Sequence, residues 1–237
     1  MASTIKQRQA ELALHRAIGS GDVEETSRLL SEGVDPNCIG DSTLNFKYAF
    51  TALCAAIQSV RHAHTQPKID AASNEALPDM PVKKLDYAAY RANCIEIMKR
   101  LLAGGADPNR RTFSRTPLSL AAYAGDAEAV SLLLDAGASP AGECWSPFSD
   151  LPRPKGGLAF CNNAIHEATS KGYTDVVRVL CDRGADTSAR DHQGKTALQI
   201  ARKRGHKDII HILERYERTT RATPRQPSTP RQKKSPH

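Results

Sequence analysis

The sequence predicts an all-α solenoid of about five stacked helix-turn-helix units, and three observations support this. Similar segments recur along the chain, and the glycines at 172 and 205 lie 33 positions apart. Most copies contain two short apolar runs, each of which ends at a glycine. Aromatic residues make up only 5% of the 237, and alanine is frequent, which suits closely packed helices better than large sheets. A self-similar period of this size indicates stacked supersecondary units.

The first helix of a unit is predicted to begin at a threonine or asparagine and to end before a glycine. Copies of it are ELALHRAIGSGD (11–22), TALCAA (from Thr51), SRTPLSLAAYAGD (114–126), CNNAIHEATSKGY (161–173) and GKTALQIARKRGH (194–206). The side chains of Thr51, Thr116, Asn163 and Thr196 can accept hydrogen bonds from the free backbone N–H groups of the first turn. Glycine suits the left-handed residue that ends a helix.

The second helix of each unit is predicted from a leucine-rich run that ends in a glycine turn. These runs are VEETSRLLSEGVDPN (23–37), IEIMKRLLAGGADPN (95–109), AEAVSLLLDAGASP (127–140) and TDVVRVLCDRGADT (174–187). In the last unit, Ile212-Leu213 takes the place of the buried pair. Apolar residues at helical spacing should face the stack and form a continuous core.

Together these copies resemble the ankyrin repeat, a β-turn with two helices and a T-P-L-H-x-A signature. TPLSLAA at Thr116 is the nearest copy, and the turns GVDPN at Gly33 and GADPN at Gly105 also match. The resemblance covers about 165 of the 237 residues. It implies β-hairpin fingers between the helix pairs. It also implies that His15 and His166, at the histidine of the signature, bind neighbouring hairpin backbone.

The predicted repeat domain spans residues 11–217, after an N-terminal segment at 1–10. Its units lie near 12–44, 51–115, 116–162, 163–195 and 196–217. The second unit carries a long insertion at 61–86, whose prolines favour an excursion, although a degenerate sixth repeat stays open. The third carries a loop at 138–160, rich in proline and glycine. The basic, proline-rich tail at 218–237 is predicted to be disordered.

No enzymatic site is predicted. Gly194-Lys195-Thr196 copies the end of a phosphate-binding loop, but Ala189 stands where that loop needs its first glycine. The stretch is better explained as a hairpin tip followed by a helix. The six cysteines, with no C-x-x-C pair, suit reduced thiols in an intracellular protein. Cys144, Cys161, His166 and Cys181 lack the paired short spacing of zinc ligands, so we expect no metal and no cofactor.

The net charge of +7 belongs mainly to the tail. Residues 215–237 hold seven bases and one acid, or +6, and the other 214 residues carry +1. The tail also holds Thr-Pro and Ser-Pro pairs, so phosphorylation and a nuclear import signal both stay open. No run approaches the roughly 18 apolar residues of a spanning helix. We expect a monomer in the cytoplasm or nucleus.

A protein-binding surface follows from the family resemblance. In ankyrin stacks the hairpin tips and the exposed side of the first helices form a concave groove that binds other proteins. The positions that match this groove, with the aromatic Trp145 of the long loop, are Tyr48, Phe50, Phe113, Arg115, Tyr123, Trp145, Lys171, His192, Lys195, Lys203 and Arg204. Aromatic residues near the middle and bases toward one end predict an acidic partner segment with an apolar anchor. The alternative is binding of nucleic acid or another anionic surface by the tail and the basic end of the groove.

Overall fold

The structure is a computed structural model that describes residues 2–40, 50–72, 86–110, 115–140, 163–191 and 193–222. In these ranges the chain is helical apart from short turns and isolated bridges. The helices are α1 (Ala2–Ser20), α2 (Val23–Ser31), α3 (Ala52–Ala72), α4 (Tyr87–Ala103), α5 (Pro117–Ala124), α6 (Ala127–Asp135), α7 (Ala164–Lys171), α8 (Thr174–Asp182), α9 (Ala197–Arg204) and α10 (Lys207–Ala222).

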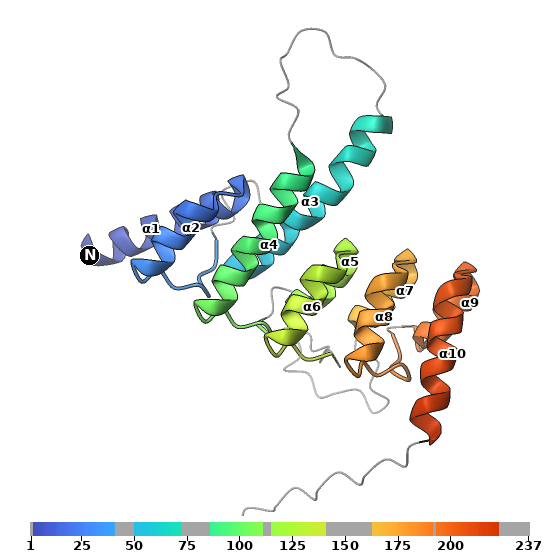
Figure 1. The fold of residues 1–237 in the computed structure, drawn as a ribbon. Coiled ribbons are helices and arrows are strands. Elements are labelled where there is room, and N and C mark those ends of the chain that lie inside the picture. The colour runs from blue at the N-terminus through green and yellow to red at the C-terminus, as the bar shows by residue number, and fades with distance from the viewer. Residues whose placement is uncertain are drawn as a thin grey trace, which may run out of the picture.

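Consecutive helices pair, and the pairs stand side by side in a row (Figure 1). The first helices, α1, α3, α5, α7 and α9, each contact the next one along the stack. The second helices, α2, α4, α6, α8 and α10, do the same and form the other layer. This arrangement confirms the predicted all-α repeat solenoid. Of the predicted hairpin fingers, the described residues include an antiparallel bridge between Ile39 and Thr51, and a turn closed by the Asp191 N–H donating to the Lys195 carbonyl.

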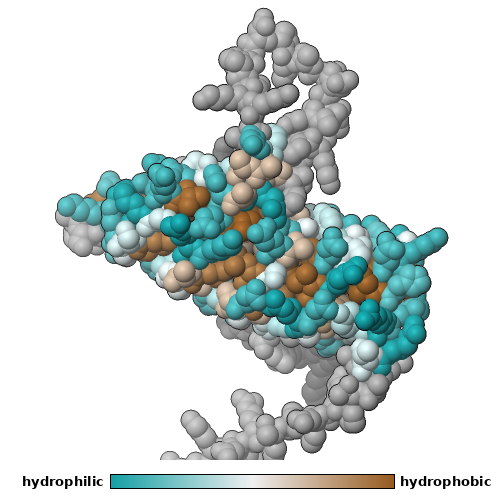
Figure 2. Space-filling view, viewed as in Figure 1, coloured by the Kyte–Doolittle hydropathy of each residue, from teal (hydrophilic) through white to brown (hydrophobic). Residues whose placement is uncertain are grey.

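The core runs the length of the stack between the two layers. Alanines at the same position of four first helices are fully buried: Ala56, Ala121, Ala168 and Ala201. Their small side chains let adjacent first helices approach closely. Hydrophilic residues cover much of the face seen in Figure 2, and a band of hydrophobic ones follows the row of units. Each unit therefore depends on its neighbours for burial of its apolar side.

The first helices begin as the sequence predicts. The hydroxyl oxygens of Thr51, Thr116 and Thr196 accept hydrogen bonds from the N–H groups of the residues three positions later, at 3.3, 3.1 and 3.4 Å. Gln199 also bonds back to the Thr196 N–H, which completes a capping box. Asn163 differs, because its side chain makes no capping bond.

The glycines that end the first helices also receive rings from the next unit. Gly125 is left-handed, with φ of 81°, and a β-carbon there would lie 2.7 Å from the Tyr173 ring. A β-carbon at Gly21 would lie 2.8 Å from the Tyr90 ring, and one at Gly172 would lie 2.9 Å from the His206 ring. Tyr90 further donates from its hydroxyl to the Gly19 carbonyl at 2.7 Å. Only a residue without a side chain meets both demands, the backbone angle and the contact.

Asparagines of the DPN turns join one unit to the next. Asn37 donates to the Gly105 carbonyl and accepts from the Asp107 N–H, at 3.0 and 2.8 Å. Asn109 makes the equivalent pair with Gly137 and Ser139, at the same two distances. These reciprocal bonds explain why asparagine ends the motif, since its amide both donates and accepts.

An ion pair links the second unit to the third. Asp126, which is 2% exposed, accepts from Nε and Nη2 of Arg91 at 2.6 and 2.9 Å. The same carboxylate caps α6 by accepting from the Ala129 N–H at 3.0 Å. The aspartate is therefore paired on both sides, as a buried charge requires.

The predicted insertion was expected to leave the helix at residue 61, but the helix continues beyond that position. Helix α3 continues through Pro67 to Ala72, although proline removes one backbone donor and usually breaks a helix. Packing of α3 against α4 supports the extension, and both helices reach beyond the row in Figure 1. Asp86 caps α4 by accepting from the N–H groups of Ala88 and Ala89. Among the described residues the insertion lengthens an existing helix and adds no sixth pair.

Two further boundaries differ at the ends of the chain. Helix α1 begins at Ala2, within the predicted N-terminal segment, and α10 extends to Ala222, within the predicted disordered tail. The rest of the tail and most of the 138–160 loop lie outside the described residues, as do positions 73–85 of the insertion.

The glycine contacts yield a stability prediction. Gly137 is left-handed like Gly125, with φ of 88°, but a β-carbon there would meet nothing within 4 Å. We expect Gly137→Ala to cost about 1–2 kcal/mol from backbone strain alone. Gly125→Ala should cost about 1–3 kcal/mol more, because the methyl group must displace the Tyr173 ring. Urea unfolding of both variants measures the difference, and equal losses would contradict the proposed contact.

His166, which is buried, and His15, which is half-buried, yield a pH prediction. Nε2 of His166 donates to the Ala189 carbonyl at 3.0 Å, which confirms the predicted backbone bond. Burial lowers the pKa of His15 and of His166, against smaller opposing effects of backbone bonds and nearby acids. The unfolded chain then binds protons more readily, so stability should fall as pH drops below about 6.5.

We expect the melting temperature to fall between pH 7.5 and 5.5, and to fall less in a His15→Gln/His166→Gln variant. Glutamine retains a donor for the backbone carbonyl and does not titrate. His62→Gln, at an exposed position on α3, is the control and should keep the full wild-type pH dependence. An unchanged slope in the double variant would contradict the assignment.

Candidate functional site

Three cationic side chains converge on the ring of Tyr123, in the last turn of α5. The Cζ atoms of Arg61 and Arg115 lie 4.9 and 4.4 Å from the ring centroid, and Nζ of Lys171 lies 4.7 Å from it. Such distances fall within the range of cation–π attraction, which contributes about 0.5–1 kcal/mol at an exposed site. Tyr123 therefore gathers positive charge at one place on the stack.

The order of the repeats brings these residues together. Arg61 lies on α3, Arg115 directly precedes the Thr116 cap of α5, and Lys171 is the last residue of α7. Helix α5 packs between α3 and α7. Three consecutive units therefore each contribute a base to one location.

A buried carboxylate holds one of the bases in place. Oε1 of Glu167, on α7, lies 3.2 Å from Nη2 of Arg115. The glutamate side chain is 8% exposed and the arginine side chain 37% exposed. Because a buried acid needs a partner, this pair orients the guanidinium while leaving part of it open to solvent. We call Arg61, Arg115, Tyr123, Glu167 and Lys171 the Tyr123 cluster.

The remaining predicted groove residues divide into three groups. Phe50 is half-buried and packs against the core. Lys195 is half-buried, with its Nζ donating to the Gln193 side chain at 2.9 Å, and Lys203 and Arg204 are exposed at the end of α9. The other four lie outside the described residues: Tyr48, Phe113, Trp145 and His192.

Sequence reasoning missed two members of the cluster, Arg61 and Glu167. Arg61 was assigned to the edge of the insertion, and its helical position depends on the continuation of α3. Glu167 follows the signature histidine on a largely buried helix. An acid there is a signal for a buried ion pair, because an unpaired carboxylate is costly in a core.

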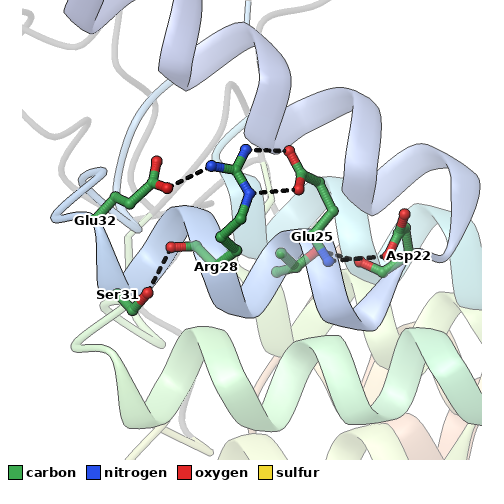
Figure 3. Close-up of polar contacts among 6 residues, drawn as sticks. Asp22, Glu25, Arg28, Ser31 and Glu32 are labelled. Atoms are coloured by element: carbon green, nitrogen blue, oxygen red, sulfur yellow. Dashed lines mark hydrogen bonds and ion pairs between the residues drawn. The ribbon is translucent and has the colours of Figure 1, made fainter.

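A second polar network lies on the exposed face of α2 (Figure 3). Arg28 donates to Glu25 at 2.6 and 2.8 Å and also pairs with Glu32. The guanidinium lowers the pKa of the Glu25 carboxyl by hydrogen bonding. These partners lie three and four residues apart on one helix, a spacing that stabilises the helix locally. This network joins no neighbouring unit, unlike the Tyr123 cluster.

The described residues contain no group of three or more side chains placed to hold a metal ion. Cys38, Cys54, Cys94 and Cys181 are buried, and none of the four forms a disulfide. Burial raises the pKa of Cys94 to about 11 and that of Cys181 to about 12, which disfavours the reactive thiolate. None of the helices in the described ranges combines the length and the apolar character needed to cross a membrane.

The chain belongs to the ankyrin repeat family. The family model for three copies of the ankyrin repeat matches residues 85–191 and 153–221, which together cover more than half of the chain. These repeats are units of protein–protein interaction, and the chain is therefore a protein-interaction module.

Among curated proteins, the chain is similar to cyclin-dependent kinase 4 inhibitor B of Rattus norvegicus. They are 34% identical over 130 residues, which are 54% of this chain and 88% of that protein. Human cyclin-dependent kinase inhibitor 2A is 31% identical over 140 residues, covering 59% and 80%. A probable E3 ubiquitin-protein ligase XBOS33 of Oryza sativa subsp. japonica is 38% identical over 93 residues, but these are 16% of its length.

The cluster yields a prediction by nuclear magnetic resonance. The side-chain protons of Arg61, Arg115 and Lys171 should be shifted upfield, because each cation lies over the face of the Tyr123 ring. Tyr123→Leu should return them toward ordinary values, whereas Tyr123→Phe should preserve the shifts. Equal spectra for these two variants would show that the three cations do not stack on this ring.

Proposed function

We propose that the chain is a non-catalytic module that binds its partner through the first-helix face, with Tyr123 as the anchor. The convergence of Arg61, Arg115 and Lys171 on this ring is the observation that carries the proposal. Tyrosine and arginine are the residue types most enriched among those that dominate binding energy. The ring is half-buried and therefore partly ordered before a partner arrives.

The charge of the surface supports an acidic partner segment with an apolar anchor. Lys171 is an exposed member of the cluster, and Lys203 and Arg204 are exposed on α9, the next helix of the same layer. Positive charges at the rim steer an acidic partner and raise the association rate. The half-buried Tyr123 ring supplies contact area once the partner has arrived.

A protein kinase is the first partner to test. The match spans 88% of one relative and 80% of another, and the names of both describe inhibition of cyclin-dependent kinases. We therefore propose a kinase domain as the class of partner, bound without chemistry by this chain.

The proposal also includes the oligomeric state of the protein and its compartment in the cell. Large exposed hydrophobic residues in the described ranges are limited to Ile5 and Ile39, which supports a monomer before partner binding. The buried cysteines at positions 38, 54, 94 and 181 form no disulfide, which supports a reducing compartment, the cytoplasm or nucleus.

Binding of nucleic acid or another anionic surface is the alternative. It would use the tail with the exposed bases of α9, Lys203 and Arg204. Its signature is a steep loss of affinity with salt that disappears when residues 223–237 are deleted. Protein binding at the Tyr123 cluster should survive that deletion.

We expect two groove variants to change partner binding in different ways. Tyr123→Ala should raise the dissociation rate, at a cost of about 1–3 kcal/mol, because it removes the anchor. Lys195→Glu/Lys203→Glu should lower the association rate, more at low salt than at high salt, because it acts through long-range charge. Surface-binding kinetics with an affinity-captured partner, cyclin-dependent kinase 4 first, measure both rates.

Glu24→Ala, on the second-helix layer, is the matched control and should leave both rates unchanged. Circular dichroism melts establish that each variant stays folded. If neither groove variant alters the kinetics, the partner binds elsewhere on the chain and the proposal is wrong.

A further inference from the structure

Asparagine side chains join the turns of the first three units, but the third turn has no asparagine to join it to the fourth. Asn37 and Asn109 each stand four residues after the left-handed glycine of their turn, and each bonds to the turn of the following unit. Four residues after Gly137, in the third turn, the chain has Ala141. A methyl group neither donates nor accepts, so this side chain cannot supply the pair of bonds between the third and fourth units.

The fourth turn has the backbone that such an asparagine would meet. In the second, third and fourth turns, the N–H group after the left-handed glycine donates to a leucine carbonyl at 2.9, 2.8 and 2.9 Å. Gly184 has φ of 80°, close to the 91° of Gly105 and the 88° of Gly137. The Gly184 carbonyl and the Asp186 N–H therefore occupy the positions to which an asparagine bonds one unit earlier.

The first three units are also joined at the opposite ends of their helices. Tyr90 donates to the Gly19 carbonyl of the first unit at 2.7 Å. The adjacent Arg91 donates to the carboxylate of Asp126, in the third unit, at 2.6 and 2.9 Å. Two neighbouring residues of α4 thus hold the units on either side of it. Together with the asparagine bonds, they link the first three units at both edges of the stack.

The junction between the third and fourth units depends more on apolar packing. The buried core includes residues of every unit, so apolar contact is continuous across all the junctions. The polar links here include the pair of Arg115 and Glu167 at 3.2 Å and an exposed pair of Arg183 and Asp135 at 2.6 Å. An exposed ion pair contributes little to stability. The missing asparagine bonds are therefore not replaced by an equivalent link at the turns.

We infer that the stack consists of two cooperative blocks, which part at this junction. The first block is the first three units, within residues 2–140, and the second block is the fourth and fifth units, within residues 163–222. Repeat units open according to the strength of the interfaces between neighbours.

Parting of the blocks would take the Tyr123 cluster apart. Tyr123 lies in the first block and Lys171 in the second, where its Nζ is 4.7 Å from the ring centroid. A partner therefore meets the complete surface only while the blocks are joined, so the junction regulates binding. This consequence for binding rests on the proposed function, whereas the parting itself is a property of the chain alone.

Hydrogen exchange of the full-length chain, measured without a partner, tests the inference. Helices α4 and α8 are a matched pair, because each has a neighbouring second helix on both sides. We expect the slowest amides of α8 to exchange at least about tenfold faster than the slowest amides of α4, since fewer bonds hold the second block. In low urea, α7 and α8 should open together and α4 separately. Equal exchange of α4 and α8 would overturn the inference.

Three substitutions test the part of the asparagine bonds. Ala141→Asn supplies the missing side chain and should slow exchange of α8 about tenfold, without changing α4. Ser188→Asn is the control, because it places asparagine at the same position of the fourth turn, but the described part of the fifth unit continues as α10 to Ala222 and offers no turn. Asn109→Ala should speed exchange of α6 about tenfold. Equal effects of the first two, or no effect of the third, would show that these bonds do not join the blocks and would overturn the inference.

The outcomes for this inference and for the proposed function are distinguishable. If α4 and α8 exchange equally while Tyr123→Ala weakens partner binding, the proposed function stands and the inference is wrong. If the blocks part as expected while Tyr123→Ala leaves binding unchanged, the two-block structure stands, and its effect on binding falls with the proposed function.

Discussion

The structure depends on close contact between each first-helix glycine and a ring from the following unit. Gly21, Gly125 and Gly172 end their helices in the left-handed conformation and receive Tyr90, Tyr173 and His206. One residue thus ends a helix and also sets the approach of the next unit. A β-carbon there would lie 2.7–2.9 Å from ring atoms, so any other residue would force the ring or the helix to shift. The eight-residue length of α5 and α7 follows, and it places Tyr123 beside Lys171.

The second unit lacks this glycine, and the position of Arg61 at the Tyr123 ring follows from its absence. The first helices of the third, fourth and fifth units end nine residues after their caps, at Gly125, Gly172 and Gly205, but the ninth residue after Thr51 is Val60, which is fully buried. Helix α3 therefore continues, and the next residue is Arg61, which reaches the Tyr123 ring. A loss of the repeat pattern thus both permits the insertion and brings a third cation to the cluster.

The repeat architecture could be predicted from sequence because its determinants are local. Helices α5 and α9 begin at the capping residues Thr116 and Thr196 and end at Gly125 and Gly205. The alanines and leucines of both helices recur at fixed spacing. The extension of α3 could not be predicted in this way, since Pro67 argues against a helix and only packing on α4 supports one. For the cluster, Tyr123, Arg115 and Lys171 were predicted one by one from the repeat register. The convergence of these residues, and the contacts that Arg61 and Glu167 make with them, depend on how far side chains extend between three neighbouring units.

The distribution of positive charge along the chain distinguishes protein binding at the Tyr123 cluster from binding of an anionic surface by the tail. Residues 1–214 carry a formal charge of only +1, and Arg61, Arg115 and Lys171 gather around one ring within this nearly neutral body. Long-range steering depends on summed charge, whereas recognition by half-buried groups depends on fixed geometry and is less screened by salt. A partner held at the cluster should therefore owe its specificity to fit around Tyr123. An anionic surface attracted by the +6 of residues 215–237 would owe its binding to charge alone, and salt would release it.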